Sequence, residues 1–192
     1  MKPVNVGVVG LGTVGAGTVD VLSRNAPEIA RRAGRDITVT RAAVRDLRRS
    51  RDCNTAAISL TEDPFAVASD PQIDVVLELM GGEEVAYEVV ATALQHGKHV
   101  VTANKALIAT RGNELFAQAS EAGLVIAFEA AVAGGIPVIK VLREGLAGNR
   151  INGLAGILNG TCNFILSEIR EQGLEYDAML SEAQRLGYAE AD

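Results

Sequence analysis

The feature that most constrains the fold is a glycine loop near the start of the chain, between an apolar run and a helical pattern. Residues 5–9 are rich in valine, and residues 13–24 place valine and leucine at helical spacing. Between them stands G-x-G-x-x-G, whose first glycine permits a tight turn, whose second lets amides approach a pyrophosphate and whose third lets helix and strand pack closely. We therefore predict a dinucleotide-binding loop rather than an ordinary glycine-rich turn. The residues expected to contact the cofactor here are Gly10, Leu11, Gly12, Thr13, Val14 and Gly15.

Apolar runs and helical patterns continue to alternate as far as residue 128. Further strands are expected at residues 37–44, 74–79, 98–102 and 124–128, and further helices at 83–95 and 106–122. Strands that alternate with helices favour a parallel sheet covered on both faces. The sequence thus predicts an α/β fold, a doubly wound Rossmann-type parallel sheet, as a dinucleotide-binding domain at residues 1–130.

The pattern changes after residue 130. We expect a connecting helix at residues 136–145, a strand at 151–158 and two helices at 162–171 and 176–186. One strand does not make a sheet of ordinary size. Residues 131–192 are therefore predicted to be the start of a second, α+β domain.

The residues after the second predicted strand bear on the choice between NADP and NAD. An arginine at this position accommodates a 2′-phosphate, whereas an acid binds the ribose hydroxyls. Arg45, with Arg48 or Arg49 nearby, favours NADP, while Asp46 leaves NAD possible. The outer arginines have a second interpretation, because runs of charge often only face solvent.

Charge and cysteine usage exclude several classes of protein. A formal net charge of −6 disfavours a nucleic-acid partner, which needs clustered positive charge. Cys53 and Cys162 match neither a disulfide framework nor a metal motif, which favours a reducing compartment. The opening residues resemble neither a signal peptide nor a membrane span. We therefore expect a cytoplasmic protein with no membrane partner.

Three further stretches resemble one enzyme family, the homoserine dehydrogenases. They are residues 101–108 (VTANKALI), the block 128–164, which ends in NGTCNF, and the closing GYAEAD at 187–192. With the glycine loop, they follow the family's order over essentially the entire chain. The resemblance implies a reversible, NAD(P)-dependent interconversion of L-homoserine and L-aspartate 4-semialdehyde, a step in threonine, methionine and isoleucine biosynthesis. It also implies that the second domain binds substrate and forms a homodimer.

Lys105 follows the strand expected at 98–102, at the carboxyl edge where open α/β sheets bind ligands. A carbonyl that receives hydride also needs a proton, and a lysine ammonium can supply one. The resemblance places the matching lysine between nicotinamide and substrate, so we expect Lys105 to be catalytic and to contact the cofactor. From the residues alone, a solvated loop lysine is an equal alternative.

Glu129 precedes a glycine-rich turn that also reads as a plain crossover between domains. The resemblance implies a monovalent cation site, Na⁺ or K⁺, because one carboxylate and several carbonyls give a weakly charged oxygen cage. The ligands implied are the Glu129 side chain and the carbonyls of Val132, Gly134 and Ile136.

Thr161 follows the expected strand at 151–158 and is a natural N-cap for the next helix. The resemblance gives it contact with homoserine, gives Glu190 the substrate's α-amino group, and brings Gly187 to the cofactor. Without the family, Glu190 would be an ordinary solvent-facing acid.

The resemblance further implies an active-site aspartate and a second catalytic lysine beyond residue 192. We therefore expect these 192 residues to bind NAD(P) without oxidising homoserine. Two alternatives stay open: a related two-domain dehydrogenase for another aldehyde or imine, and a non-catalytic NAD(P)-binding module.

Overall fold

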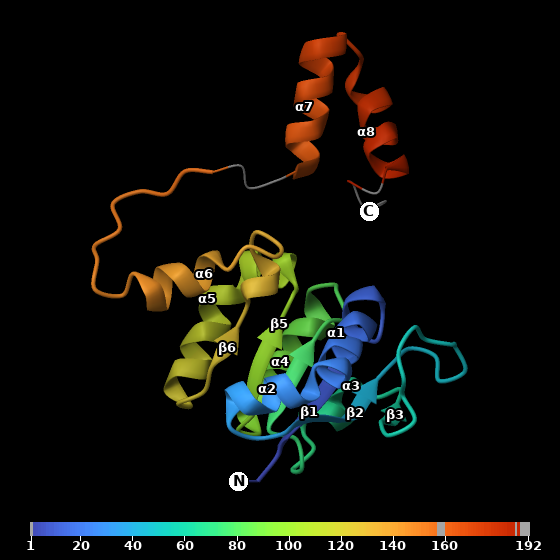
Figure 1. Cartoon of the computed structure of the whole chain (residues 1–192), viewed down its shortest axis with the longest axis vertical. Helices are drawn as coiled ribbons and strands as arrows, with labels where there is room; N and C mark the ends of the chain where they lie inside the picture. The colour runs from blue at the N-terminus through green and yellow to red at the C-terminus, as the bar shows by residue number, and fades with distance from the viewer. Residues whose placement is uncertain (1, 157–159, 187, 189–192) are drawn as a thin grey trace. The chain divides into compact units, whose positions relative to one another are not determined.

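A computed structural model describes residues 2–156, 160–186 and 188 of the chain. Two compact units make up the molecule, Met1–Lys140 and Val141–Asp192, and each is described by itself (Figure 1). The predicted domain boundary after residue 130 stays a prediction, since compactness groups the following segment with the first unit.

The first unit is built on one six-stranded sheet in which every neighbouring pair is parallel. Its order is β3-β2-β1-β4-β5-β6, so the direction of winding reverses between β1 and β4. The strands are β1 (Val4–Val9), β2 (Ile37–Ala43), β3 (Ser59–Thr61), β4 (Val75–Glu78), β5 (His99–Thr102) and β6 (Ile126–Ala127). The predicted doubly wound sheet is confirmed. At such a reversal the loops after neighbouring strands diverge, and a ligand crevice opens at the carboxyl ends.

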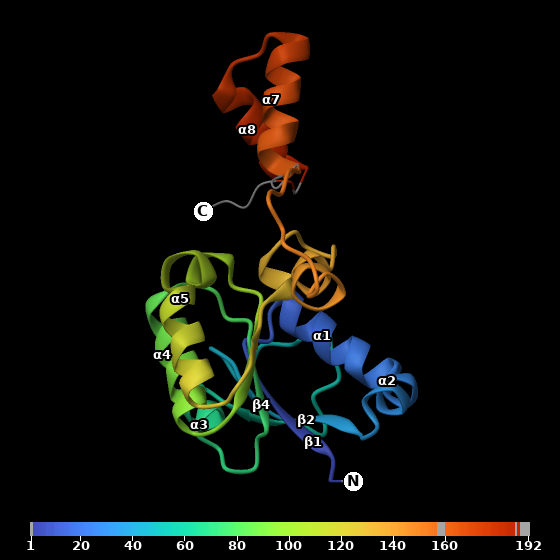
Figure 2. The same ribbon diagram turned by 90° about the vertical axis from the view of Figure 1, so that its left-hand side faces the viewer.

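Helices cover both faces of this sheet. Figure 2 shows α1 and α2 on one face, and α3, α4 and α5 on the other. Their bounds are α1 (Thr13–Arg24), α2 (Ala26–Ala33), α3 (Pro64–Ala68), α4 (Glu84–Gln95) and α5 (Lys105–Glu121). In the part of the chain that the structure describes, no helix has the length and apolar character to cross a membrane.

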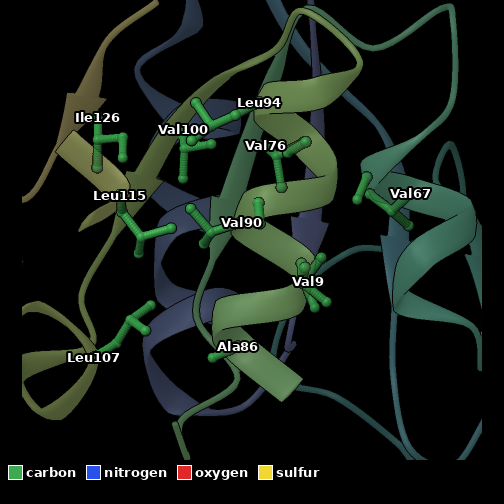
Figure 3. Packing of buried hydrophobic residues seen from close by; sticks show 14 of the residues in the cluster. Val9, Val67, Val76, Ala86, Val90, Leu94, Val100, Leu107, Leu115 and Ile126 are labelled. Carbon is green, nitrogen blue, oxygen red and sulfur yellow. The ribbon is translucent and has the colours of Figure 1, made fainter. Parts of the chain in front are cut away.

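Two clusters of buried apolar side chains hold the helices to the sheet. Neighbouring residues of β1 divide between them, because side chains alternate across a strand: Val8 joins one cluster and Val9 the other. Figure 3 shows residues of α4 packed over Val76 of β4 and Val100 of β5. Strands buried on both faces fix the positions of the loops that leave their carboxyl ends.

An ion pair fastens β2 to the turn after α3. Arg41 Nη1 donates to Asp70 Oδ2 at 2.6 Å, and the Gln72 amide donates to Asp70 Oδ1 at 2.8 Å. The Gln72 amide first, and then the Arg41 guanidinium, hold the pKa of Asp70 below its usual range. The carboxylate therefore stays charged at neutral pH, where it helps to hold β2 to the turn after α3.

The first unit closes with η1 (Glu129–Ala131), a 3₁₀ turn, and the three-residue α6 (Val138–Lys140). The connecting helix expected at residues 136–145 is confirmed over residues 138–145, but it begins two residues late and changes from α-helical to π-helical form after residue 140. Residues 141–145 form a π-helical turn, η2 (Val141–Gly145), which belongs to the second unit. Gly134, Gly135 and Pro137 delay the start of helical structure, since glycine disfavours a helix and proline tolerates only its first turn.

The second unit also contains α7 (Gly160–Gln172) and α8 (Tyr176–Arg185), which confirm the two helices expected there. The strand expected at residues 151–158 is wrong: residues 151–156 have no regular structure, and 157–158 lie outside the described residues. A lone apolar run cannot satisfy its backbone as a strand without a partner strand, and the described part of this unit offers none.

Candidate dinucleotide site

The glycine loop between β1 and α1 has the backbone that the pattern requires. Gly10 has φ of +100°, and a Cβ there would lie 2.5 Å from the Leu79 carbonyl oxygen. A Cβ on Gly15 would lie 2.0 Å from the Gly10 carbonyl oxygen, so any side chain would push α1 off the loop. By contrast, a Cβ on Gly12 would meet nothing within 4 Å. Gly12 is the N-cap of α1 and uses no side chain to cap it. The loop thus leaves open the space that a pyrophosphate fills at a helix N-terminus.

A cavity of about 420 Å³ opens at this loop. Among the predicted cofactor residues it is lined by Gly10, Leu11, Gly12, Thr13 and Arg45. Val14 and Gly15 do not line it: Val14 is exposed on α1, and Gly15 is buried under the loop. The structure therefore brings together the glycine loop and the predicted determinant of NADP preference.

The cavity also has walls that the sequence did not indicate. Glu62 and Pro64 follow β3, while Leu79 and Met80 follow β4. β3 has only three residues, which is too short for a recognisable alternation. Leu79 and Met80 had a detectable signal, because they come directly after the strand next to β1.

The loop after β2 is held by its own hydrogen bonds. The Arg48 amide donates to Asp46 Oδ1 at 2.8 Å. Arg51 donates through its guanidinium to the Asp46 carbonyl and, at 2.6 Å, to the Arg49 carbonyl. Arg45 lies on the cavity with its side chain exposed. Asp46 lines the cavity too, with one carboxylate oxygen occupied by the loop, while the side chain of Arg45 is exposed.

Lys105 is the first residue of α5, immediately beyond the carboxyl end of β5. Its neighbour Asn104 caps the helix, because Asn104 Oδ1 accepts from the Leu107 amide at 3.0 Å. Lys105 is exposed and does not line the cavity. It lies on the same edge of the sheet as the glycine loop, since the carboxyl ends of parallel strands share one edge.

A buried hydrogen-bond network lies under this edge and was missed from the sequence. Glu78, the last residue of β4, has no exposed surface. Its Oε1 accepts from the Met80 amide at 3.0 Å, and its Oε2 accepts from the Thr102 hydroxyl at 2.6 Å. The Thr102 oxygen in turn accepts from the Asn104 amide at 3.0 Å. An acid inside an apolar strand was the available signal, because such acids need partners.

The Glu129 carboxylate lies against the start of α6. Its Oε1 accepts from the Ile139 amide and its Oε2 from the Lys140 amide, each at 2.9 Å. The predicted ligand carbonyls of Val132, Gly134 and Ile136 belong to the turn between η1 and α6, where Gly134 has φ of +58°. The Ile136 carbonyl accepts from the Val138 amide at 2.8 Å. A carboxylate and backbone carbonyls have the oxygen chemistry of a weakly charged cation site, and both Glu129 carboxylate oxygens already accept amide hydrogen bonds here.

Thr161 lies inside the first turn of α7, so its prediction as an N-cap is wrong: the helix begins one residue earlier, at Gly160. Its hydroxyl donates instead to the Tyr188 carbonyl. An open hollow in this unit is lined by Gly160, Thr161, Asn163, Phe164, Ser167 and Tyr188. Two other predicted residues, Gly187 and Glu190, lie outside the described residues.

A six-stranded parallel sheet of this order, with a glycine-cradled cavity at its reversal point, defines a Rossmann-type dinucleotide-binding unit. The chain belongs to the homoserine dehydrogenase family. Residues 10–129 match the family model described as "Homoserine dehydrogenase, NAD binding domain", and residues 137–192 match the one described as "Homoserine dehydrogenase".

Individual relatives agree with this assignment. The homoserine dehydrogenase of Pseudomonas aeruginosa is 64% identical over 192 residues, which are the whole of this chain and 44% of that protein. A crystal structure of a homoserine dehydrogenase from Thiobacillus denitrificans is 61% identical, with a TM-score of 0.91, over 100% of this chain and 44% of the other. A hyperthermophilic archaeal homoserine dehydrogenase solved with NADPH is 25% identical, with a TM-score of 0.80, over 100% of this chain and 63% of the other. The chain thus spans less than half the length of the first two.

Proposed function

We propose that this chain is the cofactor-binding part of an NADP-dependent oxidoreductase that interconverts L-homoserine and L-aspartate 4-semialdehyde. The observation that carries the proposal is the shared sheet edge, with the glycine-lined cavity after β1 and Lys105 at the start of α5. NADP is preferred over NAD because Arg45 lines the cavity after β2.

The bound dinucleotide would supply the hydride acceptor at its nicotinamide ring. The backbone amides of Thr13 and Val14 at the start of α1 hold its phosphates. Lys105 Nζ lies next to the reacting alcohol, where it helps to take the hydroxyl proton during oxidation and to return it during reduction. Thr161 and Glu190 bind the homoserine, Glu190 through the substrate's α-amino group, and Gly187 approaches the cofactor.

Replacement of Lys105 tests this function. In a full-length protein of the relatives' size that carries this sequence, Lys105→Ala should lower kcat about a hundredfold, the range for lost acid–base assistance. NADP affinity should change much less. Lys2→Ala is the matched control, because Lys2 is an exposed lysine that makes one long ion pair, 3.8 Å from Nζ to Asp74 Oδ1. Near wild-type kcat in Lys105→Ala would show that Lys105 takes no part in the chemistry. A full-length protein that binds NADP but does not oxidise homoserine would be a non-catalytic binding module.

The turn at Glu129 is proposed to hold Na⁺ or K⁺ through the Glu129 carboxylate and the carbonyls of Val132, Gly134 and Ile136. Oxygen ligands with a single negative charge suit a monovalent ion. K⁺ or Na⁺ should therefore raise the Tm above its value in choline chloride of equal ionic strength, and Glu129→Gln should abolish the difference. Equal Tm values in all three salts would mean that the turn binds neither ion, and that Glu129 only accepts hydrogen bonds from the α6 amides.

The complete protein is proposed to be a cytoplasmic homodimer joined through the second unit. Support for the dimer comes from exposed apolar side chains in that unit, among them Leu154 and Leu166, each 65% exposed. We propose that these side chains contribute to an apolar surface that a second copy covers.

A further inference from the structure

We propose that Glu78 and Thr102 are positioning residues that set the nicotinamide half of the cofactor site without touching the cofactor. They do so by joining three segments at the carboxyl edge of the sheet: the glycine loop, the loop after β4, and the start of α5. The inference rests on the proposed function, since it assumes that this edge receives an NADP.

The first link joins Glu78 to the glycine loop. Glu78 Oε1 holds the Met80 amide at 3.0 Å. Met80 lies directly against Gly10, because a Cβ on Gly10 would come within 2.9 Å of the Met80 Cα. The position of the loop after β4 therefore determines how closely its backbone approaches the glycine loop.

The second link joins Glu78 to α5. Thr102 donates to Glu78 Oε2 at 2.6 Å and accepts from the Asn104 amide at 3.0 Å. Asn104 caps α5 through Leu107, and its Nδ2 donates to the Gly82 carbonyl at 2.6 Å. The residue that follows Asn104 is Lys105, so the same chain of bonds fixes the backbone from which Lys105 extends.

Burial makes this network rigid. Glu78 is 0% exposed and Thr102 is 1% exposed, so water cannot replace a lost bond. Both carboxyl oxygens accept, one from an amide and one from a hydroxyl. Removal of one donor thus leaves a buried carboxyl group with half of its hydrogen-bond partners.

The site has two halves, which makes the effect separable. The adenosine half lies at the end of β2, by Arg45, and the pyrophosphate lies at the end of β1. The nicotinamide half must then lie on the other side of the reversal point, over the ends of β4 and β5, where Glu78 and Thr102 are found. Loss of a hydrogen bond in this network should weaken the binding of NADPH and leave unchanged the binding of a ligand that contains only the adenosine half.

The test compares two ligands on the 192-residue chain by calorimetry. NADPH spans both halves, whereas adenosine 2′,5′-bisphosphate lacks the nicotinamide. Thr102→Val keeps the shape but removes the hydroxyl, and Thr102→Ser restores it. Thr110→Val is the matched control, because Thr110 lies on α5 and its hydroxyl donates only to the Ala106 carbonyl in its own helix, at 2.8 Å. Glu78→Gln probes the other member, since an amide nitrogen would meet one of the two donors.

Thr102→Val and Glu78→Gln should each weaken NADPH by about tenfold, which is about 1.4 kcal/mol, and change bisphosphate affinity by less than about twofold. Thr102→Ser and Thr110→Val should bind both ligands as the wild type does. Equal weakening of both ligands, or loss of both, would mean that the network supports only the fold and would overturn the inference. Unchanged NADPH affinity would overturn it too. A wild-type chain that binds neither ligand would instead reject the proposed function, before any variant is considered.

Discussion

Arg45 lies two residues beyond the last residue of β2, on the wall of the cavity, and we propose that its charge sets which dinucleotide the site prefers. A guanidinium can form a charge-assisted hydrogen bond with the 2′-phosphate of NADP, which NAD lacks. Arg45→Ala should therefore remove an NADP preference of about 1–2 kcal/mol. Calorimetric Kd values for NADP and NAD measure this preference directly.

The same loop provides the control for that measurement. Arg48 is an exposed arginine that does not line the cavity, so Arg48→Ala should keep the wild-type preference. If Arg45→Ala still favours NADP by the full margin, another group must bind the phosphate. Arg49 would be the next candidate, since it also lines the cavity.

Elements with long apolar patterns were predictable, and short ones were not. α4 and α5 appear where their patterns place them, but three elements have no such pattern: α2, β3 and α3. α2 and α3 nevertheless have end signals: Gly34 ends α2 at φ of +71°, and Asp63 caps α3 by accepting from the Phe65 amide at 2.8 Å. Apolar periodicity cannot reveal these three elements, whereas caps mark α2 and α3.

The site was predictable where a local pattern determines it, as in the glycine loop and at Arg45 after the second strand. The roles of the glycines follow from local geometry, so the spacing sufficed for Gly10 and Gly15. The Glu78 network depends on β4 and β5 lying side by side, which no local pattern states. Its members, Glu78 and Thr102, are 24 positions apart in the sequence.

The contact between α1 and the glycine loop gives a prediction at the scale of an element. Gly15→Ala would place a Cβ 2.0 Å from the Gly10 carbonyl oxygen, so α1 must shift away from β1. We expect a loss of about 2 kcal/mol or more in the free energy of unfolding, together with loss of NADP binding, because overpacking has costs of this size. Urea titration and calorimetry measure the two effects.

Gly17→Ala is the matched control on the same helix. Its Cβ would meet nothing within 4 Å, and the residue is exposed. Alanine favours a helix over glycine by about 0.5–1 kcal/mol, so this variant should be more stable and should bind NADP normally. Similar losses in both variants would show that the close contact at Gly15 is not the cause.

At the scale of the whole molecule, the two units differ in how they are stabilised. The first has two apolar clusters, one of which contains 17 buried residues. The described part of the second has a cluster of three, Ile165, Met179 and Ala183, between α7 and α8. A core this small supplies little of the free energy that ordering two helices costs. The second unit is therefore the part of the molecule that most needs further contacts.

Self-association through the second unit is the expected source of those contacts. Leu166 lies on α7 with 65% of its surface exposed, and in a two-fold dimer each copy would bury its own. Leu166→Asp should therefore remove two buried leucines, about 3 kcal/mol in total, and weaken dimerisation roughly a hundredfold. Val85→Asp is the control, because Val85 is an exposed apolar residue near the start of α4, in the first unit, and should leave the dimer intact. Sedimentation equilibrium measures both constants. A wild-type chain that stays monomeric at high micromolar concentration, or equal dimers of all three proteins, would contradict an interface at α7, whereas loss of the dimer in Val85→Asp alone would move the interface to the first unit.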